Sequence, residues 1–301
     1  ISPSAKNNCG RSFFMKKEKI LTRAIACAAA ACLVFSGCSM QNGETPQEAT
    51  NKAEENSTNV AETTLEASGV RMDIKDYSSD SVTWGPGNIK DHKRPTDPEN
   101  LQNKYGELNA QWLLPEGKSI CLTFDEGYEN GYTAQILDTL AEKNIKAIFF
   151  CTYDYVKDNP TLVRRMINEG HIVGNHSYNH YNMTQIDLET ASDEITMMHD
   201  YVAQMFQYEM KYFRFPEGAF SEQTIALAAD LGYRSVFWSF AYADWDRDNQ
   251  PDEAEAYNRI TSSVHDGEIM LLHAVSKSNA DILGRVIDDI EKEGYTFTIE
   301  L

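Results

Sequence analysis

Residues 120–131 read ICLTFDEGYENG, and this stretch determines the fold expected for the chain. Its first five residues are apolar, β-branched or aromatic, which is typical of a buried strand. The run then ends in two adjacent carboxylates, Asp125 and Glu126, followed by a glycine. Parallel α/β enzymes place their chemistry at the carboxyl ends of strands. Taken alone, the pair favours a strand end with two solvated acids. A catalytic role is indicated only if matching residues follow at the ends of later strands.

Strands and helices are expected to alternate from residue 118 onward. Apolar runs predict strands at 118–124, 145–151, 171–175, 211–214, 234–238, 268–273 and 295–299. Helical segments are expected between them, at 132–143, 160–168, 187–208, 221–231, 253–264 and 279–293. Such alternation implies parallel strands joined by right-handed crossovers. The sequence therefore predicts an α/β fold, one (β/α) barrel, complete or incomplete, over 118–301.

A short irregular extension is expected at 70–117, because its proline and glycine content is unfavourable for long helices. Trp84 is expected to pack on the barrel and close one side of it. His92 is interpreted as a surface histidine, with substrate contact as the alternative.

The first 37 residues are interpreted as upstream residues and an export signal, with Met15 as the expected start. A basic segment precedes the apolar run at 24–35, which is too short for a bilayer span of about 20 residues. The run ends at Cys38, as in bacterial lipoprotein signals, where the cysteine is lipidated. An ordinary cleaved signal is the alternative. Residues 38–69 then form the lipidated end and a disordered tether, which predicts an extracytoplasmic, membrane-anchored protein on the cell-wall side.

Charge and cysteine content exclude some partners and sites. The chain has 27 Lys and Arg against 46 Asp and Glu, a formal net charge of −19. Such a chain is not expected to bind nucleic acid. Cys121 and Cys151 lie in apolar runs and are expected to be buried thiols, with a disulfide as the alternative. No cysteine spacing of the metal-binding type is present.

Two histidines follow the third expected strand, in the sequence GNHSYNH at 174–180. His176 and His180 are four residues apart, and on a helical turn this spacing places both on one side. Two imidazoles so placed suit one cation. A pair of surface histidines is the alternative, which the position at a strand end disfavours. An acid from the first strand end would complete a set of two histidines and one carboxylate.

Further candidates follow the fourth and sixth expected strands. Arg214 precedes a Pro-Glu-Gly turn and either forms a structural ion pair or orients a carboxylate in the site. The backbone amide of Glu217 is a candidate donor to a developing oxyanion. His273 ends a wholly apolar strand, so it is either a satisfied core histidine or a general acid.

Five segments in order resemble the motifs of the polysaccharide deacetylases with a NodB-type domain, carbohydrate esterase family 4. They are TFDEG at 123–127, HSYNH at 176–180, RFPEG at 214–218, DW at 244–245 and LLH at 271–273. The resemblance covers 118–301 and implies a seven-stranded, distorted barrel. Some segments are closer to the PdaA-like subgroup, which makes the muramic δ-lactam of spore cortex: YENGY at 128–132, FWS at 237–239, DW at 244–245, LLHAVS at 271–276, and upstream WG at 84–85 with KDHK at 90–93.

The resemblance implies a role for each matching residue. Asp125 takes a proton from the attacking water, and His273 protonates the leaving amine. His176 and His180 hold a divalent metal ion, zinc in the first instance. The remaining roles are supporting ones: Arg214 orients Asp125, the Glu217 amide helps to hold the oxyanion, Asp244 supports the polar network, and Trp245 and Leu271 line the acetyl pocket.

Two positions depart from the family pattern. The third metal ligand is usually an aspartate, and this chain has Glu126 there. Its additional methylene must fold back to reach the metal, so we expect a weak or absent ligand. The usual acid three residues before Asp244 is Ala241, which leaves Arg214 without that ion pair.

The function implied by the resemblance is metal-dependent de-N-acetylation of a peptidoglycan sugar, with N-acetylmuramic acid as the favoured substrate. The protein is expected to be a monomer that acts on glycan strands. Deacetylation of N-acetylglucosamine or chitooligosaccharides is one alternative. A non-catalytic glycan-binding protein with an impaired metal site is the other.

Overall fold

A computed structural model describes residues 73–87, 89 and 91–301. The export signal, Cys38 and the tether at 38–69 lie outside the described residues. The described chain begins with a 3₁₀ turn, η1 (Ile74–Asp76), and a short strand, β1 (Val82–Thr83), which pairs antiparallel with β7 (Ala219–Phe220).

The other strands form one curled sheet in which every pair is parallel. Its order is β10-β3-β4-β5-β6-β8-β2, and β9 pairs with β3. The strands are β2 (Ala110–Gln111), β3 (Ser119–Glu126), β4 (Ile148–Cys151), β5 (Ile172–Asn175), β6 (Tyr212–Phe213), β8 (Arg234–Val236), β9 (Glu268–His273) and β10 (Thr296–Phe297). A lone bridge between Phe240 and Met270 links the segment after β8 to β9. The expected (β/α) barrel is confirmed in its incomplete form, with all seven predicted strands present.

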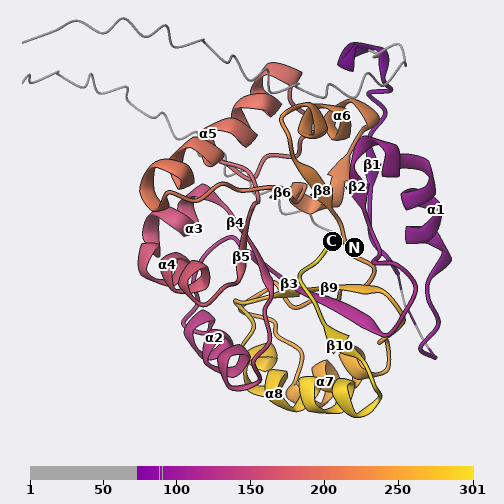
Figure 1. The fold of residues 1–301 in the computed structure, drawn as a ribbon, viewed down its shortest axis with the longest axis vertical. Helices are drawn as coiled ribbons and strands as arrows, with labels where there is room; N and C mark the ends of the chain where they lie inside the picture. Colours follow the sequence, from indigo (N-terminus) through magenta and orange to yellow (C-terminus); the bar gives the residue numbers. More distant parts are fainter. Residues whose placement is uncertain (1–72, 88, 90) are drawn as a thin grey trace, which may run out of the picture. The chain divides into compact units, whose positions relative to one another are not determined.

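Helices surround this sheet on its outer side (Figure 1). The six predicted helices are confirmed as α2 (Thr133–Glu142), α4 (Pro160–Asn168), α5 (Leu188–Phe206), α6 (Glu222–Asp230), α7 (Glu253–Thr261) and α8 (Lys277–Lys292). Ser221 caps α6 in a reciprocal capping box with Thr224, which satisfies two amides that the first turn leaves unpaired. A further helix, α3 (Tyr153–Asp158), follows β4, and no helix was predicted there.

The stretch at 70–117 is more ordered than expected. It contains a ten-residue helix, α1 (Thr96–Tyr105), a 3₁₀ turn, η2 (Gly106–Leu108), and the sheet strand β2. Proline does not prevent α1, because Pro98 lies in its first turn, where a backbone N–H has no partner in the helix. The expectation of an irregular extension was therefore wrong for this part.

Three smaller expectations are met. Trp84 packs on the barrel and its indole donates to the Trp238 carbonyl at 2.9 Å. His92 lies at the surface, with Nδ1 2.9 Å from the Val264 carbonyl oxygen. Cys121 and Cys151 are buried free thiols. Among the described helices, none has the length and apolar character needed to cross a bilayer.

Candidate active site

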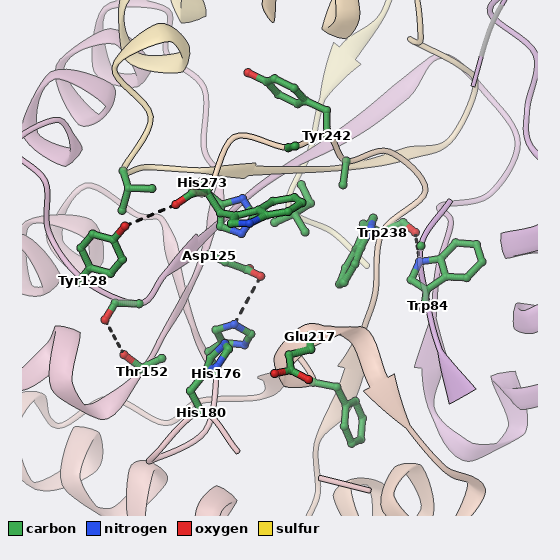
Figure 2. A pocket seen from close by; sticks show the side chains of 18 of the residues that line it. Trp84, Asp125, Tyr128, Thr152, His176, His180, Glu217, Trp238, Tyr242 and His273 are labelled. Atoms are coloured by element: carbon green, nitrogen blue, oxygen red, sulfur yellow. Dashed lines mark hydrogen bonds and ion pairs between the residues drawn. The ribbon is translucent and has the colours of Figure 1, made fainter. Parts of the chain in front are cut away.

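A cavity of about 810 Å³ opens where β3, β5 and β9 end. Several side chains expected in the site line this cavity, as Figure 2 shows for those it labels: Asp125, His176, His180, Glu217, Trp245, Leu271 and His273. The convergence expected from the strand ends is thus observed. Arg214 and Asp244 are fully buried behind this lining, and each bonds a residue that faces the cavity.

Asp125 lies near the end of β3 with its carboxylate at the cavity. One oxygen, Oδ1, accepts a hydrogen bond from Nη1 of Arg214 at 2.8 Å. Burial by itself raises the pKa of this carboxyl. The positive charge of Arg214, with smaller contributions from His176 and His273, outweighs burial and lowers the pKa below its ordinary value. Asp125 is therefore ionised and ready to accept a proton.

Arg214 is held so firmly that it fixes the direction of Asp125. Its Nε donates to the Val236 carbonyl at 3.0 Å and its Nη2 to the Phe237 carbonyl at 3.2 Å. The guanidinium also lies 4.1 Å from the centre of the Phe150 ring. With several of its donors in use, the planar group cannot turn without losing hydrogen bonds in a buried place. The geometry matches the expectation that Arg214 orients Asp125.

His176 is held in one tautomer. Its Nδ1 lies 2.9 Å from the Arg214 carbonyl oxygen, which can only accept, so Nδ1 carries the proton. The other ring nitrogen, Nε2, is then an acceptor that lies 3.5 Å from Oδ2 of Asp125 (Figure 2). Burial lowers the pKa of His176 to about 4, against the opposing effect of Asp125. A neutral imidazole with a free Nε2 is the form that ligates metal ions.

His180 lies beside His176, but the backbone between them does not have the conformation that was expected. The two ring centres are 4.8 Å apart. No helical turn brings them together, because the segment after β5 is a loop in which Ser177 (φ 70°) and His180 (φ 58°) are both left-handed. The expected helical placement was wrong, although the pairing that it predicted is observed.

His273 forms a carboxylate–imidazole pair with Asp244. The distance from Nδ1 to Asp244 Oδ1 is 2.7 Å, and the backbone amide of His273 donates to Oδ2 at 2.8 Å. Asn279 donates to the same Oδ2 at 2.6 Å. Burial disfavours the imidazolium, but the negative charge of Asp244 outweighs it and raises the pKa of His273. The ring therefore holds its second proton at a higher pH than a free histidine does, as a general acid requires.

Glu126 points away from the cavity. It follows Asp125 on a strand, where successive side chains face opposite sides. Its Oε1 lies 3.4 Å from the Thr133 hydroxyl at the start of α2, and its Oε2 is buried without a partner. Burial, and then the nearby Glu129 and Asp125, raise the pKa of Glu126 well above its ordinary value. The side chain does not line the cavity that His176 and His180 line, and the expected weak or absent ligation stays a prediction.

The remaining expected residues sit at the cavity wall. Leu271 is nearly buried, whereas 55% of Trp245 is exposed at the rim. Glu217 has a left-handed backbone (φ 59°), and its carboxylate accepts from Asn182 at 2.9 Å. Ala241, which replaces the usual acid, also lines the cavity.

Sequence reasoning missed two supporting contacts. The Thr123 hydroxyl lies 2.8 Å from Arg214 Nη1, and Asn279 bonds Asp244 from the first turn of α8. Thr123 lies in the TFDEG motif, which marks its position but not this contact, and an asparagine in the first turn of a helix is ordinary there.

The donor set fits a metal ion in part. His176 and His180 provide two imidazoles, one of them with its tautomer fixed. Within residues 73–87, 89 and 91–301, no group of three His, Cys, Asp or Glu side chains is arranged to hold a metal ion. A cation held here would have to complete its coordination with water or substrate, as catalytic zinc sites do in their open positions.

Comparison with known proteins gives a consistent result. A family model described as Polysaccharide deacetylase matches residues 114–236. The chain is 44% identical to an uncharacterized 30.6 kDa protein of Geobacillus stearothermophilus, over 73% of this chain and 84% of that protein. It is 38% identical to peptidoglycan-N-acetylmuramic acid deacetylase PdaA of Bacillus subtilis, over 73% of this chain and 84% of the relative. The structure of B. subtilis PdaA, a family 4 carbohydrate esterase, matches with a TM-score of 0.70 and covers 73% of this chain and 95% of that one.

Proposed function

Because this chain belongs to the polysaccharide deacetylases, the hydrolases of carbohydrate esterase family 4, we propose that it removes acetyl groups from N-acetylated sugars of peptidoglycan. The observation that carries the proposal is a base and an acid on neighbouring strands. Asp125 of β3 and His273 of β9 are register partners at the cavity. Their environments shift their pKa values in opposite directions, which separates the role of base from that of acid.

Asp125 and His273 can divide the two proton transfers of amide hydrolysis. As water adds to the acetyl carbon, Asp125 accepts its proton, and Arg214 holds the carboxylate in direction. When the carbon–nitrogen bond breaks, His273 gives a proton to the leaving sugar amine, and Asp244 stabilises the imidazolium until then. Acetate and a free amine are the products. Leu271 and Trp245 line the cavity, and in this proposal they would enclose the small acetyl group.

A divalent cation, zinc in the first instance, belongs to this proposal. His176 and His180 would hold it, and it would supply Lewis-acid polarisation of the acetyl carbonyl and a more acidic water. The fixed tautomer of His176 supports this assignment because Nε2 remains free to ligate.

The proposed substrate is a glycan strand, with N-acetylmuramic acid as the preferred sugar and muramic δ-lactam as the later product. The cavity volume falls in the range of about 300–1,000 Å³ that ligand sites occupy. Its wall carries the aromatic rings of Tyr128, Trp238, Tyr242 and Trp245, which provide flat apolar surfaces for sugar rings. The preference for muramic acid is taken from the activity named for the B. subtilis relative.

Acetate release from purified peptidoglycan tests the proposal. We expect Asp125→Asn to slow release by about 10²–10⁴-fold, because the variant keeps the size of the side chain and removes the base. Asp154→Asn is the matched control, since Asp154 lines the same cavity and has no part in the proton transfers. Mass spectra of the digested glycan identify the deacetylated sugar. Loss of acetyl from glucosamine alone would contradict the preference for muramic acid.

A non-catalytic glycan-binding protein is the second candidate, favoured by Glu126, which bonds Thr133 and does not line the cavity. In that case the wild-type protein would bind glycan strands and release no acetate at saturating zinc. The buried, hydrogen-bonded pairs Arg214–Asp125 and Asp244–His273 are the argument against it, since binding alone does not need them.

We also propose that the chain acts outside the cytoplasm as a monomer anchored through a lipidated Cys38. This rests on the sequence pattern at 15–38. We expect Cys38→Ala to move the protein from the membrane fraction to the soluble fraction, because lipidation supplies the apolar anchor. An unchanged distribution between the fractions would contradict the anchor.

A further inference from the structure

We propose that Glu194, on α5, is a positioning residue for the paired histidines His176 and His180. It acts through Asn179, which lies between them in the chain. The inference rests on the proposed function in assigning the two histidines to a metal ion.

Glu194 clamps Asn179 with both of its carboxylate oxygens. Its Oε2 accepts from the Asn179 backbone amide at 2.6 Å, and its Oε1 accepts from the Asn179 side-chain amide. Only 3% of Glu194 is exposed. Two donors on one residue facing two acceptors on another form a directed, charge-assisted pair.

The loop needs such a clamp because its backbone is strained. Ser177 and His180 both have a positive φ, which is uncommon for residues with a side chain. Such conformations persist where surrounding contacts over-determine them. Two of those contacts come from the loop and the end of β5: Asn175 Oδ1 accepts from the Ser177 amide, and the Ser177 hydroxyl accepts from the His180 amide, each at 2.9 Å.

Glu194 adds a tie to a rigid element. It lies in the second turn of the 19-residue helix α5, which packs on the barrel through Ile195 and Met198. His176 is fixed separately by the Arg214 carbonyl. The helix therefore sets where His180 lies relative to His176. Loss of a residue that holds metal ligands in place typically lowers metal affinity by about 10–100-fold.

The test replaces Glu194 with glutamine, which keeps its shape. The substitution removes the negative charge that strengthens both bonds, and the new NH₂ group can bond Asn179 only if the Asn179 side-chain amide turns over to accept, so the clamp is weakened. Asp193→Asn is the matched control, because Asp193 is exposed on the same helix and its substitution changes the net charge equally. Asn179→Ala is a second variant at an exposed site, and it removes the side-chain bond without disturbing α5.

Three measurements are made on the full-length protein and its variants: zinc affinity, amide exchange, and turnover at limiting and saturating zinc. Zinc affinity, from competition with a chromogenic chelator, is expected to fall about 10–100-fold in Glu194→Gln and to stay unchanged in Asp193→Asn. Amide exchange followed by NMR in the metal-free state is expected to accelerate at Asn179 and His180. Turnover lost at limiting zinc should return at saturating zinc, with KM for the glycan unchanged, which a merely structural role would not produce.

Equal zinc affinities of Glu194→Gln and Asp193→Asn would overturn the inference, as would unchanged exchange at Asn179. Either result leaves the proposed deacetylation intact if the wild type releases acetate. A wild type that releases acetate and binds no zinc would overturn the metal assignment together with this inference. Absence of acetate release, with zinc affinity reduced in Glu194→Gln, would reject the proposed activity and leave the positioning role supported.

Discussion

Asp125 and Glu126 are adjacent acids of one strand, but the first is ionised and the second is neutral because their neighbours differ. The guanidinium of Arg214 lies 2.8 Å from Asp125 and keeps it ionised against burial. The carboxyl of Glu126 accepts a hydrogen bond from the Thr133 hydroxyl and has no cation beside it among the described residues. Burial and the negative charge of Glu129 raise its pKa, so it stays neutral. A carboxyl group in a protein interior takes the charge state that its partners stabilise, so here one acid is ionised and its neighbour on the strand is neutral.

The Asp244–His273 pair gives a prediction at the same scale. Asp244 raises the pKa of His273, and activity that needs the imidazolium is lost as pH rises through that pKa. Asp244→Asn removes the negative charge and lowers the pKa. The alkaline limb of kcat/KM should therefore move to lower pH in this variant. A pH–rate profile checks it, with the exposed Asp246→Asn as control. An alkaline limb that stays in place would mean that another group is the acid.

At the scale of elements, strand register sets which residues of the candidate site lie side by side. The pairing of β3 with β9 sets Asp125 opposite His273, and the pairing of β4 with β5 sets Phe150 opposite Gly174. Phe150 lies 4.1 Å from the Arg214 guanidinium, so the packing of these two strands also supports the arginine that bonds Asp125.

Gly174 is required by this close approach. A Cβ at this position would lie 2.5 Å from Cδ1 of Phe150, closer than packed atoms come. We expect Gly174→Ala to lower the free energy of unfolding by about 1–3 kcal/mol through overpacking. Gly106→Ala is the control, because Gly106 has φ −60° and no atom within 4 Å of the added methyl. That variant should be neutral or more stable by about 0.4–1 kcal/mol. Denaturant unfolding compares them, and equal stabilities would contradict the packing argument.

At the scale of the whole described domain, the stretch before β3 helps to close the curled sheet. β2 pairs with β8, and three residues later the Leu114 amide donates to the Gly267 carbonyl beside the start of β9. Trp112 stacks on Phe237 with ring centres 4.2 Å apart. This stretch therefore spans the gap between β8 and β9, which explains why it is ordered.

Buried titratable groups in this core predict how stability depends on pH. Burial raises the pKa of Glu268 well above its ordinary value of 4.5, so the folded state holds a proton that the unfolded chain releases. The free energy of unfolding then falls as pH rises above 4.5, by up to about 1.4 kcal/mol per pH unit for this group. Glu268→Gln removes the effect, so its stability relative to wild type should increase with pH.

Denaturant unfolding of both proteins up to about pH 8 tests this. Glu116→Gln, at an exposed acid, is the control. Burial also lowers the pKa of His171 and His265 to about 4, which lowers stability as pH falls from 6.5 toward 4. Because His265 Nδ1 lies 3.3 Å from Glu268 Oε2, the variants are compared above about pH 6.5, where both histidines are neutral in the folded and the unfolded chain. A difference between Glu268→Gln and wild type that does not change with pH would show that Glu268 is ionised in the folded state.

The order of residues along the chain determined the parallel strands, the helices between them and the site residues at the strand ends. Hydrophobic periodicity and strand ends are local properties, so they could be read without a structure. The direction of Glu126, the left-handed loop that brings His180 to His176, the ordering of α1 and the clamp from Glu194 could not. Each depends on contacts between residues distant in the chain or on a backbone conformation held by such contacts, and these exist only once the sheet has curled and its helices have packed on it.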